Sequence, residues 1–261
     1  AQTMNGATMG LAYDGTGNRT QRNDAGAVTA YAYAAGSHRL QSANSASLAR
    51  QFTANALGNL TSWTGADGVA QQMSYDTFQR PATHTRNGIT TAYRFNAQDQ
   101  RVMKSQAGGT VTHRYAYAGQ NTLLAERFGN ASTGASQWTS YLWLGGQPVG
   151  LVKGNTLYWV TADHLGRPEV VTNASQQIVW RAANQAFDRS VLVDQIGGYR
   201  LGFPGQSLDA ESGLWHNGFR DYEASLGRYV QSDPIGLAGG ISTFSYVSSN
   251  PASYADPLGL V

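Results

Sequence analysis

Short runs of alternating apolar and polar residues, each following a glycine, recur through the first half of the chain. Three of these runs place a glycine seven residues before an aromatic residue: GAVTAYAY (26–33), GVAQQMSY (68–75) and GITTAYRF (88–95). Alternation with a period of two is typical of a β-strand with one buried face. The dipeptides Asp67-Gly68 and Asn87-Gly88 tolerate the positive φ angles of tight turns. Each run therefore predicts a turn that leads into a strand.

The aromatic residues that end these units are regularly spaced. Tyr33, Phe52, Tyr75, Phe95 and Tyr117 are separated by 19, 23, 20 and 22 residues. A period near 20 corresponds to one β-hairpin, which cannot bury a face alone and must stack on its neighbours. The pattern predicts an all-β fold in which hairpins stack into one continuous sheet. An ordinary antiparallel domain with chance spacing is the alternative.

A second zone, rich in tryptophan, begins near Trp138. Trp138, Trp143, Trp159 and Trp180 fall within 43 residues, in segments that again alternate and contain glycine turns. These features predict further strands. We therefore expect two units, a repeat segment over residues 1–137 and a second unit over residues 138–261.

The composition excludes several classes of function. Only 13% of the residues are charged and the net charge is +2, with no basic run, so we expect no nucleic-acid partner. The chain has no cysteine, which excludes disulfides and thiolate metal sites. No apolar run approaches the roughly 18 residues of a membrane span. The first residues continue the repeat pattern without a signal peptide, so we expect a segment of a longer protein.

The histidines do not form a metal-binding pattern. His38, His84, His113, His164 and His216 are scattered, without the His-x-His or His-x-x-x-His spacing of metal ligands, so we expect neither a metal nor a cofactor. His164 follows Asp163 directly, and adjacent side chains on a strand point to opposite faces. We expect His164 to be a hydrogen-bonded turn residue.

Several motifs resemble those of the Rhs family. YDGTGNR (13–19) and YDTFQR (75–80) are similar to its Tyr-Asp-x-x-Gly-Arg repeat, the YD repeat, although Gln79 replaces the glycine. DHLGRPEVVT (163–172) resembles the Asp-His-Leu-Gly-x-Pro signature of the family's core, with Arg167 at the variable position. The resemblance implies a curved, spiralling sheet that forms the last part of a hollow shell and is capped by the Rhs core.

The resemblance is most specific over residues 201–260. The family's elements keep their order there: Phe-Pro-Gly-Gln, Asp-Ala-Glu-x-Gly-Leu, Arg-Asp-Tyr, Gly-Arg-Tyr, Ser-Asp-Pro-Ile-Gly-Leu, Gly-Gly, Asn-Pro and Asp-Pro-x-Gly-Leu. The chain departs from the family at Glu223 and Ala224, where Asp-Pro is common, and at Ser242 and Phe244, where Asn and Tyr are frequent. The first departure changes a turn near Arg220.

In the family this block is an aspartyl autoprotease that cuts its own chain once, after the last Asp-Pro-x-Gly-Leu. By position, the catalytic residues are Asp233 and Asp256, assisted by Arg220, and the bond to be cut joins Leu260 to Val261. The residues that shape the two turns are Pro234, Gly236, Pro257 and Gly259.

The proposed chemistry suits two aspartates and an arginine. Two adjacent carboxylates do not both ionise easily, so one can accept a proton from water while the other polarises the Leu260 carbonyl. Such a pair titrates as a unit, and the sequence assigns neither role to either residue. Arg220 would hold the anion through a bidentate contact. We expect residues 239–247 (GGISTFSYV) to form a strand whose return brings Asp233 and Asp256 together.

Simpler interpretations remain open. Each Asp-Pro-x-Gly element is also an ordinary turn motif. Two other acidic pairs compete for the catalytic role, Asp209 with Glu211 and Asp221 with Glu223. We expect residues 209–213 to form a turn between strands, and Asp221 is a candidate salt-bridge partner of Arg220.

The resemblance implies the C-terminal shell and core segment of a bacterial Rhs polymorphic toxin. Such a protein encloses a C-terminal toxin and frees it from the shell chain by a single cleavage. The implied partners are the toxin domain, the rest of the shell, a secretion-machine spike and a chaperone, and the implied location is outside the producing bacterium. The alternative is a cell-surface adhesin or carbohydrate-binding YD-repeat protein without catalysis. A turnover aspartic protease is disfavoured because the Asp-Thr/Ser-Gly pair is missing.

Overall fold

The computed structural model describes residues 2–4 and 7–261. The strands of the first half are β1 (Gln2–Met4), β2 (Ala7–Tyr13), β3 (Arg19–Asp24), β4 (Ala27–Tyr33), β5 (Leu40–Ser45), β6 (Ala49–Ala54), β7 (Leu60–Thr64), β8 (Ala70–Tyr75), β9 (Pro81–Arg86), β10 (Ile89–Phe95), β11 (Arg101–Gln106), β12 (Val111–Ala118) and β13 (Thr122–Asn130). A short 3₁₀ turn, η1 (Ala107–Gly109), precedes β12.

The second half continues with strands and ends in a more irregular block. Its elements are β14 (Ser136–Leu144), β15 (Gln147–Lys153), β16 (Thr156–Ala162), β17 (Pro168–Thr172), β18 (Ile178–Asn184), β19 (Arg189–Asp194), β20 (Gln206–Asp209), β21 (Leu214–Asn217), β22 (Arg220–Glu223), β23 (Arg228–Tyr229), η2 (Gly236–Gly239) and η3 (Val247–Ser249). Within the described ranges, no helix is long and apolar enough to cross a membrane.

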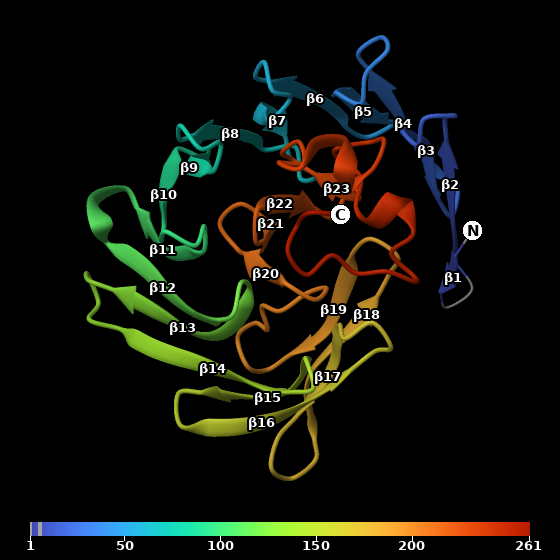
Figure 1. Ribbon diagram of the computed structural model, residues 1–261. Coiled ribbons are helices and arrows are strands. Elements are labelled where there is room, and N and C mark those ends of the chain that lie inside the picture. Colours follow the sequence, from blue (N-terminus) through green and yellow to red (C-terminus); the bar gives the residue numbers. More distant parts are fainter. Residues whose placement is uncertain (1, 5–6) are drawn as a thin grey trace.

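Strands β1–β19 form one antiparallel sheet in which each strand pairs with the next along the chain. The sheet curls without closing on itself, and the C-terminal block lies in its hollow (Figure 1). The predicted all-β fold of stacked hairpins in a curved sheet is confirmed. Residue 138 lies inside β14, so the sheet passes through the expected boundary between the two units without a break.

Four of the five repeated aromatic residues lie at β-bulges of the sheet. Tyr33, Tyr75, Phe95 and Tyr117 each lie at a β-bulge near the end of an even-numbered strand. A bulge bends its strand and increases the local twist. The three tyrosine hydroxyls also donate hydrogen bonds to the first backbone carbonyl of the preceding strand, at 2.7–3.1 Å. Phe52 is the exception, because the bulge of its strand falls between Thr53 and Ala54. A bulge that recurs near the ends of these strands favours bending of the sheet.

In several repeats an Asp or Asn directly after the strand begins the turn to the next strand. Oδ1 of Asp76 accepts hydrogen bonds from the backbone N–H groups two and four residues later, at 2.9 and 3.0 Å. Asp14, Asn55 and Asn96 bond in the same way. The residue three positions after this Asp or Asn has positive φ, and Gln79, which replaces the family's glycine, has φ 64°. Gln79 thus adopts the turn geometry that glycine favours.

The two tight turns predicted from dipeptides differ. Asn87 and Gly88 both have positive φ and join β9 to β10 as a two-residue hairpin loop, as expected. Gly68 also has positive φ, but Asp67 is not among the described residues with positive φ. The loop from β7 to β8 is longer, and Gly68 N–H closes it by donating to the Gly65 carbonyl at 3.1 Å.

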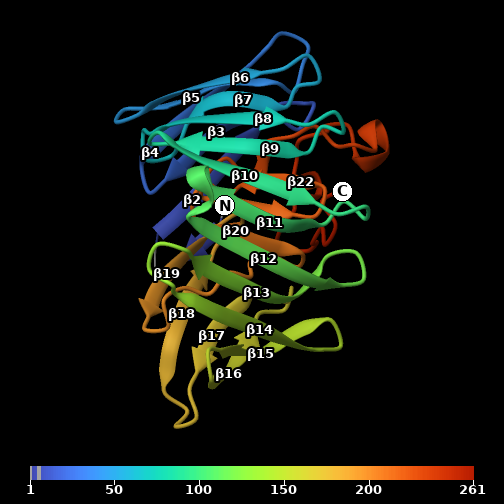
Figure 2. The same cartoon turned by 90° about the vertical axis from the view of Figure 1, so that its left-hand side faces the viewer.

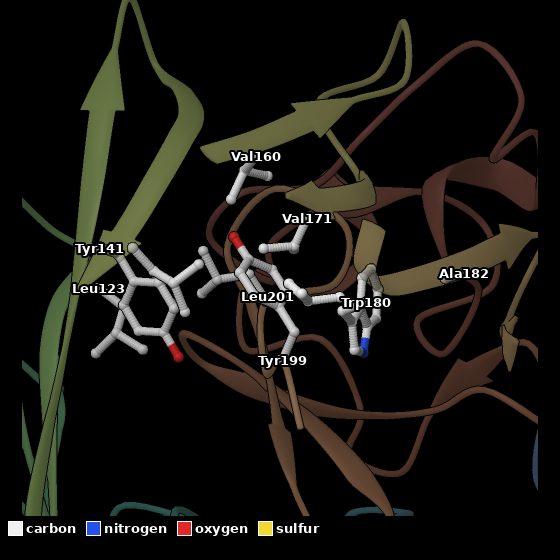
Figure 3. Close-up of a cluster of buried hydrophobic side chains, with 10 residues drawn as sticks. Leu123, Tyr141, Val160, Val171, Trp180, Ala182, Tyr199 and Leu201 are labelled. Carbon is white, nitrogen blue, oxygen red and sulfur yellow. The ribbon is translucent and has the colours of Figure 1, made fainter. Parts of the chain in front are cut away.

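The C-terminal block consists of a small antiparallel sheet, β20–β23, and the loops that follow it. It fills the concave side of the large sheet, and three clusters of buried apolar side chains stabilise this arrangement from within or across the contact. One cluster joins β13–β18 to Tyr199 and Leu201 (Figure 3). A second joins β5–β8 to Leu214, Leu226 and Val230, and a third lies within the block. In Figure 2 the block and the C-terminus lie toward one end of the strands.

The expected strand over residues 239–247 is wrong. Apart from the end of η2 and the start of η3, this segment consists of turns, with a single β-bridge between Ser245 and Arg228. Gly240 has φ 130°, and Ser245 N–H donates to the Ser242 carbonyl at 3.2 Å, so the backbone turns where a strand would continue. The alternating pattern of this segment is satisfied by burying Phe244 and Tyr246 in a compact loop.

Candidate functional site

Strand β22 presents neighbouring side chains to two different surroundings. Arg220 and Asp221 are adjacent on this strand, so their side chains point to opposite faces of the small sheet. Arg220 faces the C-terminal segment and is 1% exposed, whereas Asp221 faces β11 of the large sheet. The candidate site is built around Arg220.

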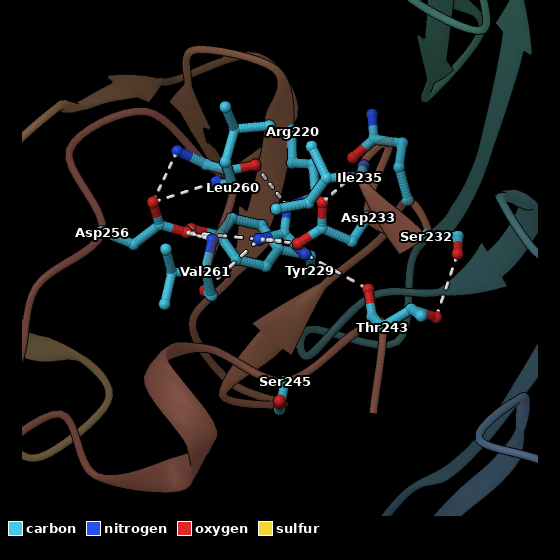
Figure 4. A network of polar contacts seen from close by, with 12 residues as sticks. Arg220, Tyr229, Ser232, Asp233, Ile235, Thr243, Ser245, Asp256, Leu260 and Val261 are labelled. Carbon is cyan, nitrogen blue, oxygen red and sulfur yellow. Dashed lines mark hydrogen bonds and ion pairs between the residues drawn. The ribbon is translucent and has the colours of Figure 1, made fainter. Parts of the chain in front are cut away.

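Arg220 brings the two predicted aspartates together. Its Nη2 lies 2.9 Å from Asp233 Oδ2 and 3.2 Å from Asp256 Oδ2. Figure 4 shows the two carboxylates on either side of the guanidinium group. Arg220 also donates to the carbonyls of Gly259, at 2.6 Å, and Val261, at 3.3 Å. One side chain therefore contacts both carboxylates and the backbone on each side of Leu260.

Asp256 organises the turn that precedes the expected cleavage point. Its Oδ1 accepts the backbone N–H groups of Gly259 and Leu260, each at 2.9 Å. Its Oδ2 accepts the N–H of Val261 at 2.9 Å, which is the N–H of the Leu260–Val261 peptide bond. Gly259 has φ 74°, the left-handed conformation that this tight turn requires. Pro257 precedes it in the turn, as the sequence predicts.

Asp233 is also buried but has fewer partners. It is 5% exposed, and its Oδ1 accepts the N–H of Ile235 at 3.0 Å. Its backbone carbonyl accepts the N–H of Gly236, which has φ 61°, so the segment with Pro234 is a turn as predicted. Burial raises the pKa of Asp233, and the charge of Asp256 adds to the rise, while Arg220 opposes it.

Two polar residues that the sequence did not single out complete the surroundings of Asp256. The Tyr229 hydroxyl donates to Asp256 Oδ2 at 2.8 Å, and the Arg220 guanidinium lies 3.7 Å from the centre of the Tyr229 ring. Asn217 Nδ2 donates to the Tyr229 hydroxyl, at 2.7 Å, and to the Asp256 backbone carbonyl, at 2.8 Å. Tyr229 belongs to the Gly-Arg-Tyr element, which was the available signal for it.

Glycines allow the C-terminal segment to lie directly against backbone. A Cβ at Gly205 would collide with the Pro257 carbonyl, and a Cβ at Gly218 with the Leu258 carbonyl. Asn121, in the loop between β12 and β13, donates to the Pro257 carbonyl at 2.8 Å. The segment is held on both sides, yet Val261 is 54% exposed at its end.

Two of the competing carboxylates, Asp209 and Glu211, belong to a separate buried network. Lys104 Nζ lies 2.7 Å from Asp209 Oδ1 and also contacts Glu211, while Arg101 lies 3.1 Å from Asp209 Oδ2. These residues join β11 to the turn between β20 and β21, which spans residues 209–213 as predicted. Glu223, at the end of β22, lies 3.9 Å from Arg50.

Asp221 is not the salt-bridge partner of Arg220 that the sequence suggested. It contacts His216 Nδ1 at 3.2 Å, and Gln231 Nε2 donates to it at 2.9 Å. The alternation of side chains along β22 is the physical reason, because adjacent residues cannot share one face of a strand.

Two further sequence predictions concern the role of His164 and the binding of a metal ion. His164 Nε2 lies 3.0 Å from the Ala252 carbonyl, in agreement with a hydrogen-bonded turn residue. Asp163 accepts the N–H groups of Leu165 and Arg167 and pairs with the Arg167 side chain at 2.8 Å. Across residues 2–4 and 7–261, no three His, Cys, Asp or Glu side chains are grouped to hold a metal ion.

Comparison with known proteins agrees with the family that the motifs resemble. A family model described as the RHS repeat matches residues 55–88, which run from one repeat turn at Asn55 to the hairpin at Gly88. The chain is 27% identical over 248 residues to "Toxin protein Tse5" of Pseudomonas aeruginosa, covering 81% of this chain and 19% of the relative. It is 38% identical over 104 residues to "Probable deoxyribonuclease RhsA" of Dickeya dadantii, covering 39% of this chain and 7% of the relative. The chain thus spans less than a fifth of the length of these two relatives.

A solved structure has the same fold. The match is the Tc holotoxin pore of Photorhabdus luminescens, with a TM-score of 0.59 and 17% identity, covering 97% of this chain and 17% of that chain. The resemblance to Rhs and YD-repeat proteins that the sequence indicated is confirmed.

Proposed function

We propose that this chain is the last part of an Rhs-type shell that encloses a C-terminal toxin. We further propose that it releases this toxin by cutting its own chain after Leu260. The reaction is a single hydrolysis in cis, performed by Asp233 and Asp256 with the help of Arg220. Each chain would therefore catalyse one cleavage of itself and no further reaction.

One observation carries the proposal. The Arg220 guanidinium contacts both aspartates, and one of these aspartates accepts the N–H of the peptide bond to be cut. Two simple turns would require neither a shared buried arginine nor a carboxylate bonded to that N–H. The ion pairs are nine-tenths or more buried, where a charge is costly unless it is paired and hydrogen-bonded.

The chemistry follows from the arrangement of these groups. The carboxylate pair removes a proton from a water molecule, whose oxygen attacks the Leu260 carbonyl carbon. The same proton is returned to the Val261 nitrogen as the C–N bond breaks, which leaves a carboxyl group on Leu260 and an amine on Val261. Enzyme and substrate share one chain, so the reacting groups are already held close together.

The curved sheet supports the proposed role as part of an enclosure. The block that carries the site lies in the hollow of the sheet, and the C-terminus lies within this block (Figure 1). We propose that the cargo is a toxin domain that continues beyond Val261. The other proposed partners are the rest of the shell, a spike of a secretion machine and a chaperone. The protein would be exported from a bacterium and used against competing or host cells.

A reporter fusion tests the proposal. A small reporter domain is fused after Val261, and the fusion is compared with its Asp233→Asn and Arg220→Ala variants by gel and intact mass. We expect the unmutated fusion to split between Leu260 and Val261 and both variants to stay whole. Asp99→Asn, in a turn that is far in sequence from the site, is the control, and this fusion should split normally. An intact unmutated fusion, or cutting at another bond, would refute the proposal.

A further inference from the structure

The two aspartates of the site are not equivalent in their hydrogen bonds. The Asp256 carboxylate receives five donors: the N–H groups of Gly259, Leu260 and Val261, the Tyr229 hydroxyl and the Arg220 guanidinium. An ionised carboxylate offers about four lone-pair sites, and a protonated one offers fewer. Asp256 is therefore occupied on both oxygens as an anion, and a water molecule finds no free acceptor on it.

Among the described residues, the Asp233 carboxylate accepts one hydrogen bond, from Ile235 N–H to Oδ1, and forms an ion pair with the Arg220 guanidinium through Oδ2. It therefore keeps lone pairs that can accept a proton from water. Its pKa is raised by burial and by the charge of Asp256, in the direction that makes a carboxylate a better base.

Gly239 lies close to both Asp233 and the carbonyl that is to be attacked. A Cβ at Gly239 would lie 2.5 Å from Asp233 Oδ2 and 3.1 Å from the Leu260 carbonyl oxygen. Both oxygens thus face the same side of this glycine, and a methyl group there would occupy the space between them. The backbone does not explain the glycine, because Gly239 lies in η2 without the positive φ that glycine tolerates.

We propose that Asp233 is the proton-transfer group of the cut, that Asp256 is an anionic clamp that orients the Leu260–Val261 bond, and that Gly239 is a positioning residue that keeps the space between Asp233 and Leu260 open. This inference rests on the proposed self-cleavage. In it, Asp233 takes one proton from the attacking water as the new C–O bond forms. Asp233 then gives that proton to the Val261 nitrogen as the C–N bond breaks, and it ends in its starting state.

The groups around Asp233 determine how the reaction depends on pH. The charged and titratable groups that face it are Arg220 on β22 and Asp256 on the C-terminal segment, and the Tyr229 ring packs on Arg220 from β23. The cut requires ionised Asp233, so its rate falls as pH drops through the pKa of this residue. Removing the charge of Asp256 lowers that pKa, because the negative charge of Asp256 helps to raise it.

The experiment uses the same reporter fusion, recovered uncut from inclusion bodies and refolded by dilution at a series of pH values. We expect Gly239→Ala to slow the cut by about 100-fold, the effect of a displacement near 1 Å at a reacting centre. Gly15→Ala is the matched control, because a Cβ at Gly15 meets nothing within 4 Å and the position lacks positive φ. Its rate should equal that of the unmutated fusion. Equal melting temperatures of the two variants would show that Gly239→Ala folds.

The aspartate variants separate the two roles. We expect Asp233→Asn to abolish the cut at every pH. Asp256→Asn should remain about 10- to 100-fold slower than the unmutated fusion, as expected for losing charge-assisted hydrogen bonds, and the acid limb of its rate should move to lower pH. The inference is overturned if Gly239→Ala cuts as fast as Gly15→Ala, or if the acid limb persists in Asp233→Asn. If the unmutated fusion is never cut, the proposed function itself fails, which is a different outcome.

Discussion

The small sheet separates two buried ionic networks that use the same residue types in different ways. On the side of β11, Arg101 and Lys104 pair with Asp209 and Glu211. On the side of the C-terminal segment, Arg220 pairs with Asp233 and Asp256. We call these the shell network and the terminal network.

The two networks differ in what they bind. In the shell network, side-chain charges of the large sheet pair with side-chain charges of the block, so its effect is to join the two. In the terminal network, Asp256 and Arg220 also bond to the backbone of residues 259–261. Buried charge alone therefore does not identify a reactive site. Buried charge that holds the backbone of one particular peptide bond is the more informative observation.

The largest effect that we expect is a loss of folding stability when the shell network is disrupted. Lys104 is 1% exposed, and its carboxylate partners raise its pKa to about 12. Lys104→Met leaves buried acidic groups short of a partner, and we expect a loss of about 3–5 kcal/mol in the free energy of unfolding. Denaturant titration followed by tryptophan fluorescence measures this loss.

The same substitution at the other lysine is the control. Lys153 donates to the carbonyls of Ile196 and Gly197, at 2.6 and 2.8 Å, and it is paired with no carboxylate among the described residues. We expect Lys153→Met to cost only about 1 kcal/mol. Equal losses in the two variants would contradict the special role of the shell network.

An intermediate effect is the dependence of folding stability on pH. Burial and the nearby charges of Lys104, Arg200 and Arg101 lower the pKa of His113 from 6.5 to about 3. The unfolded chain therefore binds a proton at His113 that the folded chain does not, so stability falls as pH drops below about 6.5. The slope from one such group is at most about 1.4 kcal/mol per pH unit. Melting temperatures between pH 7 and about 5 measure it.

A substitution separates His113 from the other buried histidines. His84 and His216 also have lowered pKa values and add to the same trend. We expect His113→Gln to flatten the dependence on pH without removing it. A dependence identical to that of the unmutated chain would show that His113 is not responsible.

The smallest effect should come from an exposed ion pair of the repeat turns. Arg80 pairs with Asp99 at 2.7 Å, and the Asp99 side chain is 44% exposed. We expect Asp99→Asn, which keeps a residue that tolerates positive φ at this turn, to cost less than about 1 kcal/mol. The same denaturant titration measures it. A loss as large as that of Lys104→Met would mean that burial is not what distinguishes the shell network.

Local patterns predicted the large sheet well because each hairpin is defined by nearby residues. Most of the predicted turns and alternating strands correspond to observed elements, and Asn87-Gly88 forms the expected hairpin loop. Asp67-Gly68 lies in a longer loop, and Phe52 precedes the bulge of its strand, whereas the other four repeated aromatic residues lie at theirs. The pattern failed over residues 239–247. There, the alternating apolar residues pack a loop inside the block. A period of two along the chain does not predict such a loop.

The site was predicted in part. The motifs identified Asp233, Asp256 and Arg220, and the structure brings them together. They did not identify Asn217, they contained Gly239 only as part of the Gly-Gly element without a role, and they suggested the wrong partner for Asp221. Asn217 and Gly239 act through the approach of segments far apart in the sequence, and the face to which a β22 side chain points depends on the strand register.

The sequence by itself determined the class of fold and the hairpin period, because turns and strands depend on short-range sterics and alternation. Its resemblance to the Rhs family indicated which residues lie around the expected cut. Only the tertiary structure decided which carboxylates share an arginine, which one is saturated with donors and which glycine faces the carbonyl. These properties depend on distances between segments that meet only when the block packs into the hollow of the sheet. The physical reason is that hydrogen bonds and ion pairs act over a few ångströms in space, whatever the separation along the chain.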